Sequence, residues 1–210
     1  MSFLFKSYLR LLQRYTLPTQ MATSAATASV GDLLYQTQFE DKSLRDVEWY
    51  KTQRMCLYGG LIWAPISNRW HTLVLNQINL RGRVKTVLAR TVTDLALFSP
   101  FATCLFYLSQ GAFERRPFRT PSAAPDAPQG IYERLGERLW PTVQKQWAVW
   151  GPVNLVNLSV IPVYGRPPFS NLIAVGWNCF LAAGAARGGI PPGGLTIDMQ
   201  EKLAAAEAME

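Results

Sequence analysis

Residues 146–181 read QWAVWGPVNLVNLSVIPVYGRPPFSNLIAVGWNCFL, and this stretch decides the fold class. It sets three tryptophans and four asparagines into an otherwise apolar run whose single charge is Arg166. A soluble core rarely holds so many amides among aromatic side chains, because each buried amide needs a hydrogen-bond partner. A membrane helix bundle holds them more readily, since polar groups there face one another or a wet cavity. The stretch therefore favours a membrane helix bundle.

The composition of the whole chain is consistent with two classes of protein. Hydrophobic residues make up 49% of the 210 residues and charged residues only 17%, which is low for a soluble protein. The mean hydropathy of +0.02 is nevertheless modest for a membrane protein. Seven tryptophans fit anchoring at a membrane interface and equally a packed globular core. Composition alone does not separate a membrane bundle from a soluble all-α domain.

Five segments combine helical length with low charge, and strand alternation is weak everywhere. They are about residues 17–36, 54–75, 88–110, 147–163 and 169–186. The sequence thus predicts an all-α protein, a polytopic membrane helix bundle of four to five spans over residues 17–187. A proline-rich loop is expected within it at 111–130, and a Gly/Pro linker with an acidic tail is expected at 188–210.

Two sequence features predict how these helices pack. Small residues recur every four positions in the first segment, as at Thr23, Thr27 and Gly31, and such ridges let helices approach closely in lipid. Pro65 and Pro100 fall inside the second and third segments, where a proline frees a carbonyl and kinks a helix. Kinked helices commonly surround cavities in membrane bundles, and simple packing adjustments give the same pattern.

Residues 1–16 predict a basic amphipathic helix at the amino terminus. Lys6, Arg10 and Arg14 recur every four residues and share one helical face, and no acidic residue precedes Asp32. Such a helix is typical of mitochondrial targeting segments and of helices that lie in a membrane interface. A surface helix of a globular domain would show the same pattern.

The net charge of +7 suggests an anionic partner. The basic residues fall in the gaps between apolar segments and not in one stripe, which favours lipid headgroups over nucleic acid. We therefore expect the lipid bilayer as a partner and no nucleic acid, with other subunits of a membrane complex as a further alternative. Anionic lipid such as cardiolipin is expected at a basic loop formed by Arg81, Arg83, Lys85 and Arg90.

Signals for catalysis, metal binding or a cofactor are missing from the sequence. The chain has a single histidine, His71, and its three cysteines each lie in an apolar run, which indicates buried free thiols. There is no nucleophile–base pair, no pair of carboxylates at catalytic spacing and no glycine-rich phosphate loop. We expect no enzymatic activity, no metal site and no cofactor.

The candidate functional residues are polar groups inside or near the ends of the apolar segments. An ionised group at the centre of a bilayer costs roughly 2.5–3.5 kcal/mol on insertion scales, so each needs a partner, water or an interfacial depth. These residues would line a polar path, tie helices together, or sit near headgroups. They are Asp32, Arg69, Asp94, Asn154, Asn157 and Asn178.

Four short motifs follow one another along residues 7–182. The first has Tyr8, Pro18, Gly31-Asp32 and Gln36; the second has Arg54, Gly60, Pro65 and Trp70; the third has Asp94 and Pro100; the last has Trp147, Trp150, Pro152, Asn154, Asn157, Pro162, Arg166 and Trp177-Asn178. In this order they resemble the family named for Mpv-seventeen and the 22-kDa peroxisomal membrane protein, which are small α-helical membrane proteins of organelles. His71, Gly151, Asn154 and Leu158 depart from the family's pattern.

The resemblance implies an integral protein of the mitochondrial inner membrane, with the peroxisomal membrane as the alternative. It also implies a link to small-solute channel activity and metabolite homeostasis. The alternative function is a non-catalytic accessory subunit of a larger mitochondrial membrane complex, because the loop at 111–130 and the tail after Ala186 look like additions to the family's core.

Overall fold

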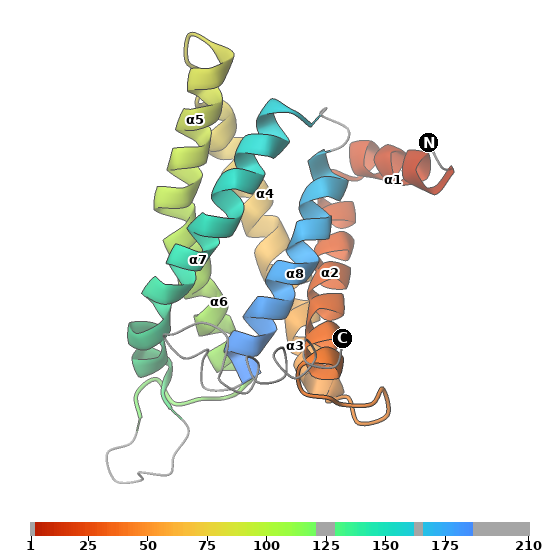
Figure 1. Cartoon of the computed structure of the whole chain (residues 1–210), viewed down its shortest axis with the longest axis vertical. Coiled ribbons are helices and arrows are strands. Elements are labelled where there is room, and N and C mark those ends of the chain that lie inside the picture. The colour runs from red at the N-terminus through yellow and green to blue at the C-terminus, as the bar shows by residue number, and fades with distance from the viewer. Residues whose placement is uncertain (1–2, 121–128, 162–165, 187–210) are drawn as a thin grey trace, which may run out of the picture.

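The computed structural model describes residues 3–120, 129–161 and 166–186, which form helices and connecting turns with no strand among them. Long helices stand side by side as a bundle, and a short amino-terminal helix projects sideways from one end (Figure 1). The all-α prediction is confirmed. The helices are α1 (Phe3–Arg14), α2 (Thr16–Gln38), α3 (Trp49–Leu57), α4 (Ala64–Leu73), α5 (Arg83–Thr93), α6 (Ser99–Phe113), α7 (Ile131–Ser159) and α8 (Arg166–Ala186).

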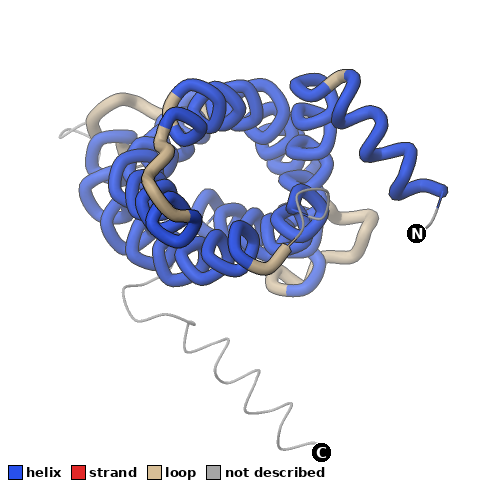
Figure 2. The backbone as a smooth tube through the Cα atoms, turned by 90° about the horizontal axis from the view of Figure 1, so that it is seen from above, coloured by secondary structure: helices blue, strands red, loops and turns tan. Residues whose placement is uncertain are grey.

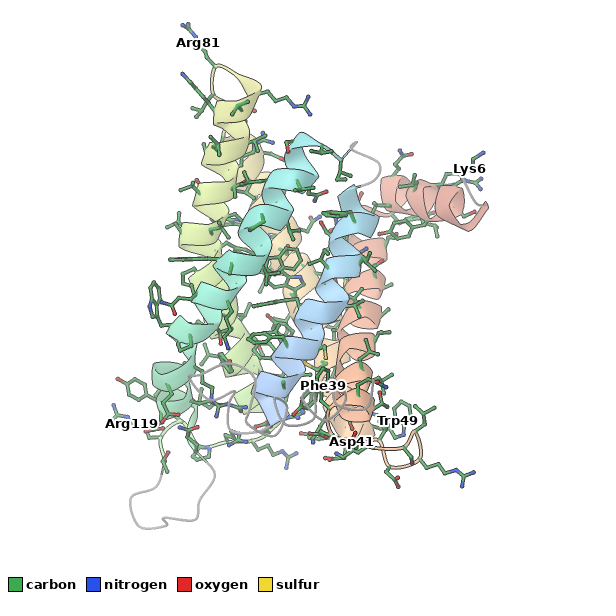
Figure 3. All side chains as sticks on the ribbon, in the orientation of Figure 1. Lys6, Phe39, Asp41, Trp49, Arg81 and Arg119 are labelled. Carbon is green, nitrogen blue, oxygen red and sulfur yellow. The ribbon has the colours of Figure 1, made fainter. Side chains whose placement is uncertain are left out.

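The two ends of the bundle differ in charge. Lys6 on α1 and Arg81 in the turn before α5 lie at one end, which we call the basic end (Figure 3). Asp41 and Arg119 lie at the other, which we call the mixed end. Seen along the bundle axis, the helices form a ring with α1 outside it (Figure 2).

Two π-helical turns interrupt the helices ahead of the prolines that the sequence singled out. One, η1 (Tyr58–Trp63), joins α3 to α4, and the other, η3 (Asp94–Phe98), joins α5 to α6. Pro65 and Pro100 each stand second in the helix that follows. Since a proline cannot donate a backbone hydrogen bond, the helix widens just before it. The interruptions expected at these prolines are therefore present as π turns.

Helix α2 approaches two neighbours at backbone distance. A Cβ added at Gly31 would lie 2.6 Å from the Cβ of Asn178 in α8 and 2.7 Å from the backbone nitrogen of Cys179. A Cβ added at Gly59 in η1 would lie 2.6 Å from the carbonyl oxygen of Ser24. Only glycine fits such approaches without a shift of one helix. Of the small-residue ridge predicted for α2, Gly31 is thus a close packing point.

Several predicted boundaries differ from the structure. Helix α7 begins at Ile131 and not near residue 147, because charged residues in its first turns are buried against neighbours. The expected basic loop is wrong: Arg83, Lys85 and Arg90 belong to α5, and only Arg81 lies in a turn. The loop predicted from residue 111 begins after Phe113. Residues 121–128, Pro162 and the predicted linker and tail at 188–210 lie outside the described residues.

Apolar side chains cover much of the outside of the bundle, and many polar ones are buried. Large exposed apolar surfaces of this kind are rare in soluble proteins. The exposed apolar residues include Val30, Leu34, Leu61, Leu88, Val92, Leu97, Phe101, Leu155 and Leu172. The buried polar residues include Asp32, Gln36, Thr52, Ser99, Thr103, Gln110, Thr142, Gln146 and Asn157.

One continuous helical stretch of the described chain has both the length and the apolarity to cross a membrane. It runs from Arg83 to Phe113, 31 residues, and contains an 18-residue window with a mean hydropathy of 1.4. Residues Phe169–Ala185 form a shorter apolar helix. The polar side chains buried in the other helices lower their hydropathy, so apolarity alone does not identify those helices as spans.

Replacing Gly31 with alanine should destabilise the bundle, because the new methyl group overlaps α8. We expect a loss of about 1–3 kcal/mol in the free energy of unfolding, seen as a lower thermal midpoint in detergent. Gly176→Ala is the matched control, since nothing lies within 4 Å of a Cβ there. That variant should unfold at the wild-type temperature or slightly above it. Equal midpoints for the two variants would refute the close approach of α2 and α8.

Candidate functional site

The carboxylate of Asp94 joins three helical segments. Asp94 opens η3, and its Oδ1 accepts a hydrogen bond from the indole Nε1 of Trp70 in α4 at 2.9 Å. Its Oδ2 accepts one from Nδ2 of Asn154 in α7 at 3.3 Å. The π turn brings Asp94 to this position between α4 and α7. Two of the predicted site residues and one motif tryptophan therefore meet at a single carboxylate.

A second carboxylate centre lies between α2 and the start of α3. Asp32 accepts hydrogen bonds from the hydroxyl of Thr52 at 2.6 Å and from Nε2 of Gln36 at 2.8 Å. Gln36 is fully buried, and its Oε1 accepts a hydrogen bond from the backbone N–H of Glu48 at 2.8 Å. Gln36 thus orients the carboxylate and also holds the chain where it enters α3.

The remaining predicted residues do not join these two centres. Nδ2 of Asn157 donates to the hydroxyl of Ser170 at 2.9 Å and so links α7 to α8. Nδ2 of Asn178 donates to the carbonyl of Ala174 within its own helix at 2.8 Å. Of the six residues, Asp94 and Asn154 bond to each other, and the six form no single hydrogen-bonded network among the described side chains.

Arg69 pairs with neither of the two acids. This residue is exposed on α4 and makes no ion pair within the described chain. Asp32 and Asp94 instead take hydrogen bonds from neutral hydroxyl, amide and indole groups. Each carboxylate thus sits between helices without an ion-pair partner among the described residues.

The two carboxylates lie at different depths. Asp94 follows the start of α5 by eleven residues, which is about 17 Å along a helix that starts at the basic end. Asp32 precedes the end of α2 by six residues, which is about 9 Å from the mixed end. The basic-end half and the mixed-end half of the bundle therefore each hold one acidic centre.

Trp147 satisfies a carbonyl that Pro100 leaves free. In the π turn, the N–H of Ser99 bonds to the carbonyl five residues earlier, that of Asp94. With the same spacing, an N–H at residue 100 would bond to the carbonyl of Leu95. Pro100 has no N–H, and the indole Nε1 of Trp147 donates to the Leu95 carbonyl instead, at 2.7 Å. An unsatisfied buried carbonyl costs about 1–3 kcal/mol, so this tryptophan couples α7 to η3.

The remaining motif residues occupy several kinds of position. Gly60 lies against α2, where an added Cβ would be 3.1 Å from the Cβ of Ala25. Trp177 stacks on Phe180 with ring centroids 4.9 Å apart. Trp150 is half-buried on α7. Arg166 is the first residue of α8, and its side chain is outside the described part of the structure.

Polar contacts between α6 and α7 were missed by the sequence analysis. The hydroxyl of Thr103 donates to Oε1 of Gln146 at 2.8 Å, and the hydroxyls of Tyr107 and Thr142 lie 2.9 Å apart. Threonine and tyrosine are common in apolar helices, so their types alone gave no signal. Their recurrence on one face of each helix was the only available hint.

A buried ionic cluster at the mixed end was also missed. Glu114 forms ion pairs with three arginines: Arg54 of α3, the nearby Arg116, and Arg134 of α7. Arg134, which is 1% exposed, also donates to the carbonyl of Ala185 at 2.6 Å. Both Arg134 and Arg138 donate to the carbonyl of Gly184. The last turn of α8 leaves carbonyls without partners in its own helix, and these two arginines satisfy them.

The arginines of this cluster also set the acidity of Glu114. Burial raises the pKa of the Glu114 carboxyl, but hydrogen bonds from Arg116 and Arg54 and the charge of Arg134 more than offset burial. The pKa of Glu114 therefore lies below its usual value of 4.5. The sequence did carry a signal for this cluster. Arg134 and Arg138 are four residues apart, which places two charges on one face of α7.

These features define a helical membrane protein whose exterior is apolar and whose polar groups are paired between helices. The model of the Mpv17 / PMP22 family matches residues 126–182. Protein SYM1 of Gibberella zeae is 31% identical over 183 residues, covering 87% of this chain and 97% of the relative. Protein sym-1 of Neurospora crassa is 30% identical over 165 residues, covering 78% and 88%. The chain belongs to the Mpv17/PMP22 family.

The relatives extend to yeast. Protein SYM1 of Saccharomyces cerevisiae is 26% identical over 176 residues, covering 81% of this chain and 84% of the relative. No solved structure matches the chain. The family resemblance drawn from the motifs is confirmed, and the family model includes the tryptophan- and asparagine-rich stretch that indicated it.

Replacing Trp147 with phenylalanine should destabilise the protein by about 1–3 kcal/mol, because the carbonyl of Leu95 loses its donor. In a Pro100→Ala background the new N–H of residue 100 can serve that carbonyl, so the same substitution should cost less. A double-mutant cycle of thermal stability in detergent measures this coupling. Trp49→Phe is the control, because Trp49 is largely exposed. Additive effects of the two substitutions would contradict the proposed exchange of donors.

Glu114→Gln should destabilise the mixed end by about 3 kcal/mol at neutral pH, because it leaves buried arginines without their counter-charge. The folded pKa of Glu114 is depressed, so its stabilising contribution is complete above about pH 4.5 and is lost as the pH falls through the folded pKa. The stability gap between wild type and variant should therefore close in acid, as followed by thermal unfolding at several pH values. Glu137→Gln, at an exposed position, should show a small gap throughout. A Glu114→Gln gap that persists in acid would argue against the ionic cluster.

Proposed function

We propose that this protein crosses the mitochondrial inner membrane four to five times and provides a weakly selective path for small solutes. The observation that carries the proposal is the pair of carboxylates, Asp32 and Asp94, that lie between helices with only neutral hydrogen-bond donors. Holding a carboxylate in lipid is costly, and such residues commonly mark solute or ion pathways. The proposed activity requires no covalent chemistry and no cofactor.

The lengths of the helices support several spans. A span needs about 20 residues, since the hydrocarbon core is about 30 Å thick and a helix rises about 1.5 Å per residue. Five helical stretches reach that length: α2, α3 through α4, α5 through α6, α7 and α8. Their exposed leucines, valines and phenylalanines would face lipid, and their buried amides and hydroxyls would face one another.

The two carboxylates would favour cations over anions on such a path. A carboxylate in a medium of low dielectric attracts cations and repels anions more strongly than it would in water. Asp94 is the better placed of the two to exchange partners, because its bond to Asn154 at 3.3 Å is longer than a typical N–H···O hydrogen bond. Asn154 could turn from the carboxylate to a passing solute while Trp70 keeps its hydrogen bond to Oδ1.

The location in the mitochondrial inner membrane is supported by the basic amphipathic α1, which is typical of mitochondrial targeting segments and of interfacial helices. A peroxisomal membrane is the alternative. Cell fractionation separates the two: the protein should resist alkaline carbonate extraction and sediment with inner-membrane markers. Sedimentation with peroxisomal markers would favour the alternative.

An accessory role in a larger membrane complex is the second candidate, and one observation favours it. Both oxygens of Asp94 are already hydrogen-bonded, and Asn154 and Asn157 each reach another helix. Polar groups that hold helices together in a structural subunit have the same arrangement. Native gel migration after mild detergent extraction tests this candidate, because an accessory subunit should migrate within a large assembly.

Asp94→Asn tests the solute path directly. Asparagine keeps an oxygen for Trp70 but removes the charge, so the ratio of cation to anion permeability in liposomes should fall several-fold while the protein stays folded. Glu137→Gln removes an exposed acid outside the site and should leave the ratio unchanged. No flux from the wild-type protein, or identical selectivity in Asp94→Asn, would sink the channel proposal and leave the accessory role.

A further inference from the structure

The amino-terminal helix lies across the bundle and not along it. Figure 1 shows α1 projecting sideways from the basic end, across the direction of the long helices. The chain bends at Tyr15 between α1 and α2. Nδ2 of Asn171 in α8 donates to the hydroxyl of Tyr8 at 3.3 Å, which ties α1 to the bundle. If the long helices cross a bilayer, α1 runs parallel to its surface.

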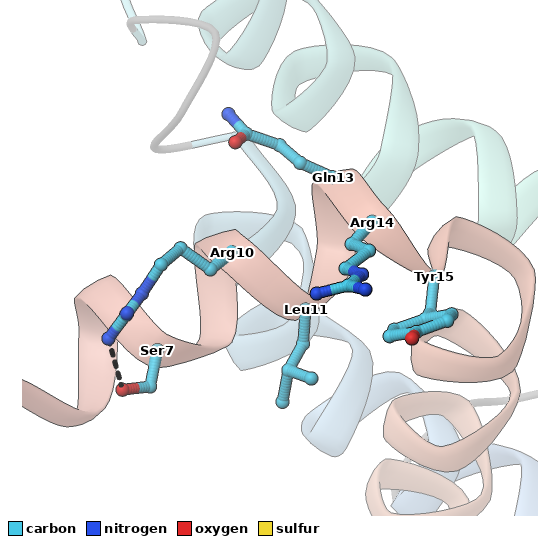
Figure 4. Close-up of a pocket in the computed structure, with 6 residues that line it drawn as sticks. All are labelled: Ser7, Arg10, Leu11, Gln13, Arg14 and Tyr15. Carbon is cyan, nitrogen blue, oxygen red and sulfur yellow. Dashed lines mark hydrogen bonds between the residues drawn. The ribbon is translucent and has the colours of Figure 1, made fainter.

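The two sides of α1 differ in polarity, and the apolar side faces the direction in which the bundle extends. Lys6 points away from the bundle (Figure 3). Gln13 points away from α2, whereas Leu11 points along the direction in which α2 runs (Figure 4). Leu11 and Tyr15 are about half exposed, at 52% and 50%, and they help to line an open groove of about 630 Å³ in the bend. The described protein leaves this apolar side largely uncovered.

The basic residues near this helix have no acidic partners. Lys6, Arg10 and Arg14 are exposed, and the described residues at the basic end include no acidic side chain. Arg83 and Lys85 are exposed at the start of α5, at the same end. Arg90 does not belong to this surface, because its guanidinium bonds to the carbonyl of Ile78 and the side chain of Asn79.

We propose that α1 and the first turn of α5 form a surface that seats the basic end on an anionic lipid leaflet. The inference rests on the proposed membrane embedding. Leu11 and Tyr15 enter the boundary of the hydrocarbon region beside α2, and the lysine and arginines contact lipid phosphates. A lipid surface fits better than a soluble anionic partner, because Leu11 points along the direction in which α2 runs, and α2 itself exposes apolar side chains such as Leu17 and Val30.

The charge of the leaflet should decide how firmly α1 is seated. Each basic side chain near an anionic surface favours the bound position about five-fold at low ionic strength, so three together contribute roughly a hundred-fold. Salt screens this attraction. The Arg83 and Lys85 side chains add to the attraction but lie on a separate helix. Neutralising α1 alone should therefore release α1 and leave the rest of the bundle in place.

The experiment measures the depth of spin labels on the full chain in vesicles. The three cysteines are replaced by serine, and a nitroxide is placed at Leu11→Cys, at Gln13→Cys or at Leu97→Cys. Depth follows from the relative access of oxygen and of a water-soluble nickel complex. Vesicles of phosphatidylcholine alone are compared with vesicles of phosphatidylcholine and cardiolipin. We expect the Leu11 label to be deep and the Gln13 label shallow in cardiolipin vesicles, with the Leu11 label shallower in neutral vesicles.

Two triple variants separate the charge of α1 from the charge of the chain. Lys6→Gln with Arg10→Gln and Arg14→Gln should move the Leu11 label to water even with cardiolipin. The matched control replaces three exposed arginines of the mixed end by glutamine and should leave that label deep. These arginines are Arg45, Arg115 and Arg119.

The label at Leu97, an exposed apolar position within the Arg83–Phe113 stretch, separates two kinds of failure. A deep Leu97 label with a Leu11 label always in water would overturn the seating of α1 and leave the membrane embedding intact. An equally deep Leu11 label in neutral vesicles, unchanged by the triple variant, would overturn the role of anionic lipid. A Leu97 label in water would overturn the embedding itself and the proposal with it.

Discussion

The contact of α2 with α8 and with η1 at backbone distance is the constraint on which the rest of the structure depends. In lipid, helices gain little from the hydrophobic effect when they associate, so close packing and hydrogen bonds must hold them together. Gly31 and Gly59 let three helical segments meet without intervening side chains. This contact places Asp32 and Gln36 against the start of α3, where Thr52 and the backbone of Glu48 complete their hydrogen bonds. A wider separation would break these bonds as well as the packing.

The second half of the bundle is organised by a proline and not by glycine. Pro100 removes one backbone donor, η3 widens the helix, and the freed carbonyl of Leu95 binds the indole of Trp147. The same turn presents Asp94 to Trp70 and Asn154. One missing N–H therefore sets the register of α7 against α5 and α6, and this register brings the amides of α7 to the site.

The sequence predicted much of the helix content, and it failed where distant partners decide. The amides of α7 were recognised because polar groups are rare in apolar runs, but nothing along the chain shows that Asn154 would meet an acid 60 residues earlier. Arg69 was grouped with the polar residues in or near the apolar segments, and the sequence left its partner open; the structure exposes it on α4 without an ion pair among the described residues. Arg134 and Arg138 were passed over because charges usually face water, and α8 alone provides the carbonyls that bury them. Local sequence patterns thus predicted the helices, whereas the ion cluster depends on tertiary contacts that these patterns do not show.

The arginines that bind the last turn of α8 have a consequence for the order of assembly. Helix α7 is synthesised before α8, and until α8 is complete Arg134 and Arg138 have no carbonyls of Gly184 and Ala185 to bind. Arg134 then keeps its ion pair with Glu114, but both guanidinium groups lack the backbone acceptors that satisfy them in the folded protein. Helix α8 therefore completes the hydrogen bonding of α7 during biogenesis, and a chain that ended before residue 184 would leave both arginines without these carbonyls.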